Sequence, residues 1–430
     1  MPEKFDVIIV GAGPAGSSAA YKAAEAGLKV LLIERGEYPG AKNVMGGVLY
    51  RKQMEDIIPE FWKEAPLERP IVEQRAWLLD KGSVVTMGYK EEEWGQEPYN
   101  NFTIFRAQFD QWFAKKAVEK GAVLINETVV KEVLVENGKV IGVRTDRPDG
   151  DVHADIVILA DGVNSLLAKQ LGFHNELRSD QVALAAMEVL NLPKEKINER
   201  FNLEGDQGCT IELFGDATHG NLGTSFIYTN KESISIGVGT TLSSMTKQKL
   251  RPYQLLDYVK SHPMVKNLIE GAEPAEYLAH LIPEGGYKAM PKLAGNGVLV
   301  VGDAAHLVNG IHREGSNMAM ASGLMAAETA IHAKEKGDFS ESTLGVYSDR
   351  IYTSFIGDDL KKYKDVTHTF ETHPYIKDYI PMINKAAHEF FTIDGKTKRE
   401  KQGEVMKGFF AEKGKIKVLQ DFYRAWRVLK

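Results

Sequence analysis

Cysteine is almost absent from this chain of 430 residues, which contains one, Cys209. A single thiol excludes an intramolecular disulfide framework. It also excludes a zinc or iron–sulfur site built from this chain's cysteines alone, because such sites need several cysteine ligands. At this length the chain has room for about two to four domains and can bury a large core without disulfides or a structural metal. We therefore expect a cytoplasmic protein.

Long hydrophobic runs are also missing. No stretch reaches the roughly 18 consecutive apolar residues of a membrane-spanning helix, and the first apolar run is short and ends in glycines, unlike a signal peptide. Positive charge is not in excess, since 53 Lys and Arg stand against 59 Asp and Glu, a net charge of −6. This balance argues against a nucleic-acid partner. Peripheral contact with the inner face of the membrane stays open.

A glycine-rich turn near the N-terminus lies between a predicted strand and a predicted helix. Residues 5–10 (FDVIIV) form an apolar run typical of a buried parallel strand, and residues 17–26 are rich in alanine and helical in pattern. The turn between them, GAGPAG, fits the dinucleotide fingerprint G-x-G-x-x-G. In that fingerprint Gly11 permits the tight turn, Gly13 lets the backbone approach a pyrophosphate, and Gly16 allows close packing of helix on strand.

An acidic residue follows the second strand, predicted over residues 28–33. Glu34 lies 18 residues beyond Gly16, where it can accept hydrogen bonds from an adenosine ribose. The strand, turn, helix and strand form a βαβ unit of about 30 residues, which is the context that the fingerprint requires. A nucleotide-binding domain is therefore predicted here.

Two further strands end in an acidic residue beside a glycine. Asp161-Gly162 begins the segment DGVNS after residues 154–160, and Gly302-Asp303 begins GDAAH after residues 297–301. A carboxylate at a strand end can bind a ribose or ribityl hydroxyl, and the glycines permit close backbone approach. Strands of one type thus recur at 5–10, 28–34, 155–160 and 297–301, which predicts a discontinuous nucleotide domain. Residues 181–241 are mostly β in pattern and form an insertion.

Together, GAGPAG with Glu34, DGVNS and GDAAH resemble the FAD-binding pattern of the glutathione-reductase-type flavoprotein superfamily. The resemblance is to the branch that contains aromatic hydroxylases, geranylgeranyl reductases and electron transfer flavoprotein–quinone oxidoreductases. Three blocks narrow it to the FixC-type quinone oxidoreductases: GAKNVMGGVLY (40–50), PEGGYKAMPKL (283–293) and GDAAHLVNGIHREGSNMAMASG (302–323). The similarity covers essentially the whole chain.

The resemblance implies an α/β fold with three parts. A discontinuous Rossmann-like FAD-binding domain covers residues 1–72, 100–175 and 285–345. An inserted antiparallel β-rich domain for substrate or quinone covers residues 73–99 and 176–284. The rest, 346–430, is a mainly helical C-terminal region for docking to a partner or a membrane. In the first domain we also expect a helix over 106–120, short strands with an Asn137-Gly138 turn over 122–145, and a helix over 315–336, while residues 36–50 look like an extended loop.

The resemblance also implies a non-covalent FAD and a set of residues around it. Gly11, Gly13 and Gly16 hold the pyrophosphate, Glu34 the adenosine ribose, and Asp303 the flavin-side ribityl–pyrophosphate. Gly46 and Gly47 lie beside the isoalloxazine, and Arg106 is the first residue of a helix that approaches the cofactor. The helix near Gly315 aims its amides at the flavin pyrimidine edge, where reduction places negative charge. The remaining expected members are Pro14, Ala15, Arg35, Val130, Asp161, Gly162, Gly302, Ser316 and Asn317. We expect no metal, and the sequence identifies no catalytic side chain, because the flavin carries the chemistry.

Two features of the sequence differ from the patterns of related flavoproteins. His306 stands where many FixC-like chains carry a small residue, and we interpret it as a polar residue near the phosphates, behind the groups that contact them. Aromatic hydroxylases follow GDAAH with a proline and a G-x-G turn, whereas Ile311-His312-Arg313-Glu314-Gly315 intervenes here. This difference weakens the hydroxylase interpretation.

The sequence contains no second complete G-x-G-x-x-G fingerprint, and this bears on the source of the electrons. The segment GVGTTL (237–242) has two of the three fingerprint glycines and fits a strand end, so no second nucleotide domain is evident. The resemblance favours three partners: an electron transfer flavoprotein with α and β subunits, a small ferredoxin-like iron–sulfur subunit of FixX type, and a quinone acceptor. An electron-bifurcating type of electron transfer flavoprotein is among those that the resemblance implies. Two alternatives stay open: an NAD(P)H-dependent flavin reductase of isoprenoid double bonds, and a non-catalytic FAD scaffold.

The C-terminal segment is basic and amphipathic. Residues 406–430 contain seven Lys and Arg against Glu412 and Asp421, and Leu419, Phe422, Tyr423, Trp426 and Leu429 recur at helical spacing. Such a helix suits an anionic lipid surface or an acidic partner, but it also suits packing on its own domain. Residues 375–391 form a second candidate.

Overall fold

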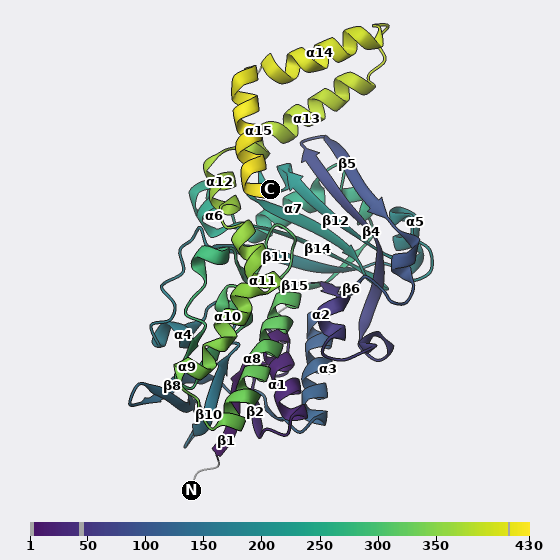
Figure 1. Cartoon of the computed structure of the whole chain (residues 1–430). Helices are drawn as coiled ribbons and strands as arrows, with labels where there is room; N and C mark the ends of the chain where they lie inside the picture. The colour runs from purple at the N-terminus through teal and green to yellow at the C-terminus, as the bar shows by residue number, and fades with distance from the viewer. Residues whose placement is uncertain (1–3, 43–46, 412) are drawn as a thin grey trace. The chain divides into compact units, whose positions relative to one another are not determined.

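The computed structural model describes residues 4–42, 47–411 and 413–430 (Figure 1). The chain folds into two compact units. Unit 1 comprises Met1–Glu68, Tyr99–Val182 and His280–Lys361, and unit 2 comprises Arg69–Pro98, Ala183–Ala279 and Lys362–Lys430. Each unit is therefore assembled from segments that are far apart in the sequence.

Unit 1 is built on a sheet whose central strands are parallel. The strand order is β16-β17-β10-β1-β2-β7, and the hairpin β8–β9 pairs with β10. The strands are β1 (Lys4–Val10), β2 (Val30–Ile33), β7 (Val123–Ile125), β8 (Val130–Glu136), β9 (Lys139–Thr145), β10 (Asp151–Leu159), β16 (Ala294–Gly295) and β17 (Val298–Val300). Continuous apolar runs suit these positions because both faces of a parallel sheet are covered. The pairing confirms that the four predicted strands share one sheet.

Three helices of unit 1 pack side by side along this sheet (Figure 1): α1 (Pro14–Glu25), α3 (Arg106–Glu119) and α8 (Ser316–Lys336). The Ser18 hydroxyl donates to the Met320 carbonyl at 2.7 Å. Where α8 crosses α1, a Cβ on Gly323 would lie 2.1 Å from the Ala15 carbonyl oxygen, so only glycine permits this approach. The predicted helices at 106–120 and 315–336 are confirmed.

Shorter elements complete unit 1. Part of the segment expected to be an extended loop is a strand, since β3 (Val48–Tyr50) pairs antiparallel with β6 (Asn101–Ile104). Cross-strand hydrogen bonds thus override the glycine-rich local pattern. The helices are α2 (Arg51–Glu55), α4 (Leu166–Gln170), α9 (Glu341–Leu344), α10 (Val346–Thr353) and α11 (Phe355–Lys362).

Unit 2 contains a largely antiparallel sheet, in the order β15-β11-β14-β13-β12-β4, with β5 paired to β4. Its strands are β4 (Leu67–Asp80), β5 (Ser83–Lys90), β11 (Val182–Asn191), β12 (Gly208–Gly215), β13 (Gly223–Thr229), β14 (Ser233–Thr241) and β15 (Glu273–Pro283), and its first helices are α5 (Lys194–Phe201), α6 (Leu242–Gln248) and α7 (Pro252–Ser261). The GVGTTL segment lies largely in β14, where a Cβ on Gly237 would meet the Phe226 ring at 2.2 Å. Its glycines serve packing, which confirms the strand interpretation.

The C-terminal helices are α12 (Val366–Thr372), α13 (Tyr375–Phe391), α14 (Lys398–Ala411) and α15 (Lys415–Leu429). Asn384 fixes α13 on the sheet of unit 2, because its side-chain amide donates to the Leu78 carbonyl at 3.0 Å and its carbonyl accepts from the Ser83 hydroxyl at 2.9 Å. Tyr375, Tyr379, Met382 and Val418 form a small core between α13 and α15. Among the residues that the structure describes, no helix is both long and apolar enough to cross a membrane.

Candidate functional site

The glycines of GAGPAG have two different surroundings. A Cβ on Gly11 (φ 101°) would lie 2.3 Å from the Ala160 carbonyl oxygen, and one on Gly16 would lie 1.8 Å from the Gly11 carbonyl oxygen. Both positions are glycine because the protein packs against them. A Cβ on Gly13 would meet Arg106 Nη2 alone, at 3.9 Å. The space before Gly13, at the N-terminus of α1 where Pro14 and Ala15 begin the helix, is therefore open to a ligand and fits a pyrophosphate.

Glu34 directly follows β2, and its side chain is buried beside this turn. One carboxylate oxygen accepts the Ala12 amide at 3.0 Å and the other accepts the Gly36 amide at 2.6 Å. Each oxygen keeps a lone pair for a hydroxyl donor, which fits a ribose. Arg35, the next residue, is exposed. The segment that leads into Val130, the first residue of β8, is held here because the Thr128 amide donates to the Glu34 carbonyl at 3.0 Å.

Asp161 follows β10, and its two carboxylate oxygens have different surroundings. One oxygen accepts the Leu167 amide at 3.3 Å, and the other, Oδ1, is buried with no hydrogen-bond partner among the described residues. Burial raises the pKa of this carboxyl to about 6. Gly162 has a φ of 78°, which takes the chain away from the strand. A buried acceptor without a donor fits a ligand hydroxyl in this place.

The GDAAH segment packs against the first turn of helix α1. A Cβ on Gly302 (φ 60°) would lie 2.9 Å from Ala15 Cβ, and the Gly302 amide donates to Ser322 at 3.0 Å. The Ser165 hydroxyl donates to the Ala304 carbonyl at 2.9 Å and so ties the DGVNS segment to this turn. Burial raises the pKa of Asp303, while the charge of Arg106 opposes the shift. The three motifs therefore meet at one end of the sheet.

Arg106, the first residue of α3, is fixed by a partner that sequence reasoning missed. Its Nε and Nη2 donate to the two carboxylate oxygens of Asp110, each at 2.8 Å, and both side chains are buried. The bidentate pair holds the guanidinium plane beside Gly13. The i,i+4 spacing of an Arg and an Asp in a predicted helix is the signal that would have identified Asp110.

The N-terminus of α8 lies next to the GDAAH turn, since Ala319 Cβ is 3.4 Å from a Cβ built on Gly302. Gly315 is the N-cap residue and gives the helix no side-chain cap, so the amides after it, beginning with Ser316, stay available. Asn317 is buried, and its Oδ1 lacks a partner among the described residues. Gly47 is buried and accepts the Ile104 amide at 2.9 Å. The expectation for Gly46 lies outside the described residues.

Two histidines of unit 1 are held in their neutral form. Burial, followed by the charges of Arg106 and Arg35, lowers the pKa of His280 to about 4. Burial likewise lowers the pKa of His306 to about 4, and its ring lies 4.6 Å from that of His174. The role expected for His306 near the phosphates stays a prediction.

Comparisons with known proteins agree along the chain. A family model described as FAD dependent oxidoreductase matches residues 6–176, and the ETF-QO/FixC family C-terminal domain matches residues 366–430. Protein FixC of Bradyrhizobium diazoefficiens is 48% identical over 99% of both chains, and Protein FixC of Azotobacter vinelandii is 46% identical over 100% of both. A probable electron transfer flavoprotein-quinone oxidoreductase of Escherichia coli K12 is 38% identical over 97% of both.

Solved structures share the fold. A geranylgeranyl bacteriochlorophyll reductase-like protein from Thermoplasma acidophilum aligns with a TM-score of 0.76 at 20% identity, over 98% of this chain and 99% of that one. A myxobacterial FAD-dependent halogenase aligns with a TM-score of 0.68 at 20% identity, over 96% and 91%. The predicted α/β FAD-binding fold is thus confirmed, and FAD is the cofactor that the described cradle fits. With near-half identity to FixC proteins over its full length, the chain belongs to the FixC family of FAD-dependent oxidoreductases.

Proposed function

We propose that this chain receives electrons from an electron transfer flavoprotein, made of α and β subunits, and passes them to a quinone. The observation that carries the proposal is its similarity over the full length to FixC proteins and to a protein named as a probable electron transfer flavoprotein-quinone oxidoreductase. The family match at residues 366–430 extends the similarity to the C-terminal helices.

Bound FAD supplies the electron-transfer chemistry, and the chain's residues hold and polarise it. Gly11, Gly13 and Gly16 bind the pyrophosphate at the N-terminus of α1. Glu34 accepts the ribose hydroxyls, while the unpartnered oxygen of Asp161 accepts another hydroxyl. The set also includes Pro14, Ala15, Arg35, Gly46, Gly47, Arg106, Val130, Gly162, Gly302, Asp303, Gly315, Ser316 and Asn317.

The electric field of the site favours negative charge on the cofactor. The first amides of α8 have no side-chain cap, and a helix N-terminus of this kind would stabilise an anion bound there. The Arg106 guanidinium is kept in place by its bidentate pair with Asp110, which compensates its charge. The N-terminus of α8 would thus favour negative charge on a bound flavin.

A separate iron–sulfur subunit completes the route. The single cysteine of this sequence, Cys209, is fully buried in β12, and burial raises its pKa to about 12. A cluster needs several thiolates, so we assign it to a small ferredoxin-like FixX-type partner. The electron transfer flavoprotein upstream is of the bifurcating kind, and the complex works at the inner face of the membrane, where quinone is found.

Mixing experiments test this route. The FAD-loaded chain is combined with reduced electron transfer flavoprotein, with and without the ferredoxin-like subunit, and flavin absorbance is followed before and after a short-chain quinone is added. We expect the flavin to bleach and then to recover with quinone. Rapid bleaching by NADPH alone, with turnover of a prenyl substrate, would instead support an isoprenoid reductase. A flavin that never changes redox state during turnover would support a scaffold.

A further inference from the structure

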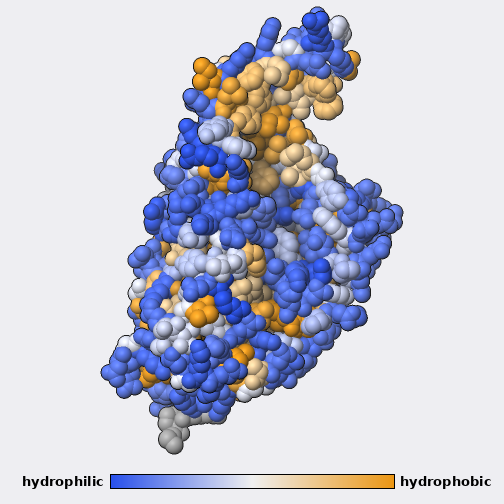
Figure 2. Space-filling model, viewed as in Figure 1, coloured by the Kyte–Doolittle hydropathy of each residue, from blue (hydrophilic) through white to orange (hydrophobic). Residues whose placement is uncertain are grey.

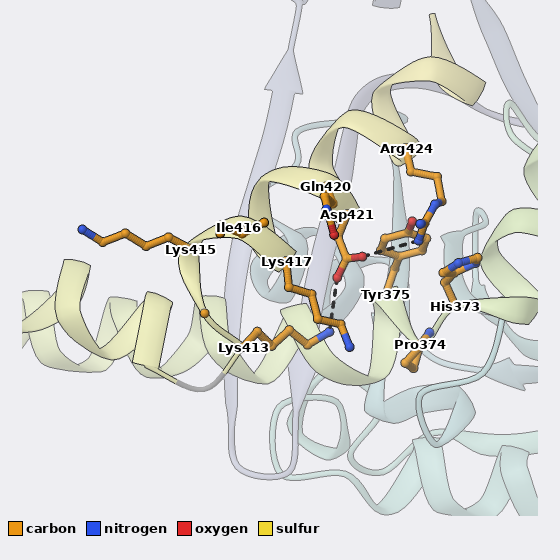
Figure 3. A pocket seen from close by; sticks show the side chains of 11 residues that line it. His373, Pro374, Tyr375, Lys413, Lys415, Ile416, Lys417, Gln420, Asp421 and Arg424 are labelled. Atoms are coloured by element: carbon orange, nitrogen blue, oxygen red, sulfur yellow. Dashed lines mark ion pairs between the residues drawn. The ribbon is translucent and has the colours of Figure 1, made fainter.

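The C-terminal helices of unit 2 enclose a pocket that the electron route does not use (Figure 3). Its volume is about 860 Å³, and it lies between the segment that starts α13 and the N-terminus of α15. The residues that matter for its chemistry are His373, Tyr375, Lys413, Lys417, Asp421 and Arg424. All of them belong to unit 2.

The pocket is cationic. Four Lys and Arg side chains line it against one carboxylate, that of Asp421. This carboxylate is already engaged, because it accepts the Tyr379 hydroxyl at 2.8 Å and lies 3.6 Å from both Lys413 and Arg424. The first amides of the 15-residue helix α15 add the positive end of a helix dipole. Lys413 also forms an ion pair with Asp378, so among the described residues two of the four cations, Lys415 and Lys417, have no carboxylate partner. This remaining charge suits an anion with several acceptor oxygens.

A buried hydroxyl in the wall gives independent evidence of a ligand. Tyr375 is 8% exposed, and its hydroxyl has no hydrogen-bond partner among the described residues. Its ring is fixed by stacking on His373, with 5.6 Å between the ring centres, and by contact with Phe370 at 5.0 Å. In Figure 3 the Tyr375 ring lies beside Asp421 and Arg424. A buried hydroxyl left unpaired costs free energy, so an acceptor is expected at this point.

Apolar side chains stand immediately beside the pocket. Along α15, the exposed stripe consists of Ile416, Leu419, Tyr423 and Trp426, with exposed fractions from 75% to 54%. The inward stripe of the same helix contains Val418 and Val428, which are buried. Figure 2 shows hydrophobic residues gathered over the C-terminal helices. Because the apolar stripe and the cationic residues are neighbours on one helix, a ligand that binds both is an amphiphile.

We propose that this pocket binds the phosphate of an anionic phospholipid headgroup. The phosphate oxygens accept from Tyr375, Lys417, Arg424 and the first amides of α15, and the acyl chains lie along the exposed stripe of α15. An acidic protein surface would match the charge, but it would not use the exposed apolar stripe. The proposal is independent of the proposed electron route, since vesicle binding is measured without turnover.

The test is sedimentation of the FAD-loaded chain with vesicles of phosphatidylcholine alone or mixed with phosphatidylglycerol. We expect binding to the mixed vesicles only. The decisive variant is Tyr375→Phe, which keeps every charge but loses one hydrogen bond to a charged acceptor, and we expect it to bind about tenfold more weakly. Tyr253→Phe, on α7 and outside the pocket, is the matched control and should bind as the wild type does.

Charge variants separate a defined site from general attraction. Lys417→Gln with Arg424→Gln removes two charges that line the pocket. Arg427→Gln with Lys430→Gln removes two charges at the C-terminal end of α15 that do not line it, since Lys430 directly follows the helix. We expect a loss of affinity at least tenfold greater for the first pair, and flavin content and circular dichroism check folding. Equal losses together with an unaltered Tyr375→Phe variant would overturn the proposal, as would absence of binding to the mixed vesicles. If inorganic phosphate alone stabilises the wild type but not Tyr375→Phe, and vesicles do not bind, the source is a free phosphate and the lipid assignment is wrong.

Discussion

The backbone amide of Ala12, inside the glycine turn, donates a 3.0 Å hydrogen bond to Oε2 of Glu34 at the end of the neighbouring strand. Gly36 donates to the other oxygen at 2.6 Å. The carboxylate is thus oriented by two backbone donors before any cofactor arrives, and it links the pyrophosphate turn to the ribose position. Preorganisation of this kind reduces the entropic cost of binding.

Replacing Glu34 with Gln should weaken FAD binding. A Gln side chain has one acceptor oxygen, so its NH2 group must face one of the two backbone amides, and the charge-assisted bonds are lost. We expect the dissociation constant for FAD, titrated into the flavin-free chain, to rise by about tenfold to a hundredfold, as for loss of a hydrogen bond to a charged group. Glu37→Gln, at an exposed position nearby, is the control and should leave the constant unchanged. Equal affinity in the two variants would contradict the ribose assignment.

Gly13→Val should abolish FAD retention without unfolding the chain. Gly13 has a φ of −75°, which any residue adopts, and the position has free space on the protein side. A valine side chain would therefore occupy the space of the pyrophosphate without colliding with the protein. The ratio of flavin to protein absorbance after purification measures retention, and the melting temperature of the flavin-free chain measures folding.

Gly16→Val is the contrasting control. A Cβ there lies 1.8 Å from the Gly11 carbonyl oxygen, so this variant should fail to fold whether or not FAD is present. If Gly13→Val retains FAD, the pyrophosphate does not lie where we place it.

The sheet of unit 1 could be predicted from the sequence because its strands are uninterrupted apolar runs bounded by glycines. The Asn137-Gly138 turn was equally predictable, since both residues adopt positive φ, 49° and 75°, as a two-residue hairpin turn requires. The motifs at Gly11, Asp161 and Gly302 were found because each follows such a strand. Local sequence was sufficient in these places because local structure and tertiary structure agree.

Contacts between side chains could not be predicted in the same way. Asp161 was expected to serve a ligand, yet one of its oxygens accepts the Leu167 amide, and this depends on where α4 begins. The direction of α15 is a second example. Val418 and Val428 face inward while Leu419 and Trp426 face solvent, although both stripes contain apolar residues. Periodicity identifies the stripes, but the packing partner decides which one is buried.

The raised pKa of Asp161 predicts a pH-dependent stability of the flavin-free chain. The folded carboxyl titrates at about 6 and an unfolded one near 3.8, so between these values the folded state binds the proton more tightly. Stability is therefore lost as the pH rises through this interval, by about 3 kcal/mol for a shift of this size. Asp161→Asn does not titrate and should retain that stability.

Urea unfolding of the flavin-free wild type and the Asp161→Asn variant, at pH values on either side of the interval, measures the effect. The difference between the two chains should grow as the pH rises and then level off above the folded pKa. Asp149→Asn, at an exposed position, is the matched control for the loss of one carboxylate. A constant difference for Asp161→Asn would mean that this carboxyl is not buried as described.

Cys209 should resist alkylation until unit 2 unfolds. Its thiol has no exposed surface, and burial raises its pKa to about 12, so almost no thiolate forms at mildly alkaline pH. We expect iodoacetamide, followed by mass spectrometry, to modify the native chain more than about a thousandfold more slowly than the urea-unfolded chain, since opening of a core strand approaches the free energy of global unfolding. The control is Ser261→Cys in a Cys209→Ala background, which places a thiol at an exposed position of α7 and should react at the rate of a free thiol. Rapid modification of Cys209 in the folded protein would show that β12 opens readily, and its thiol would then have to be considered as a reactive group.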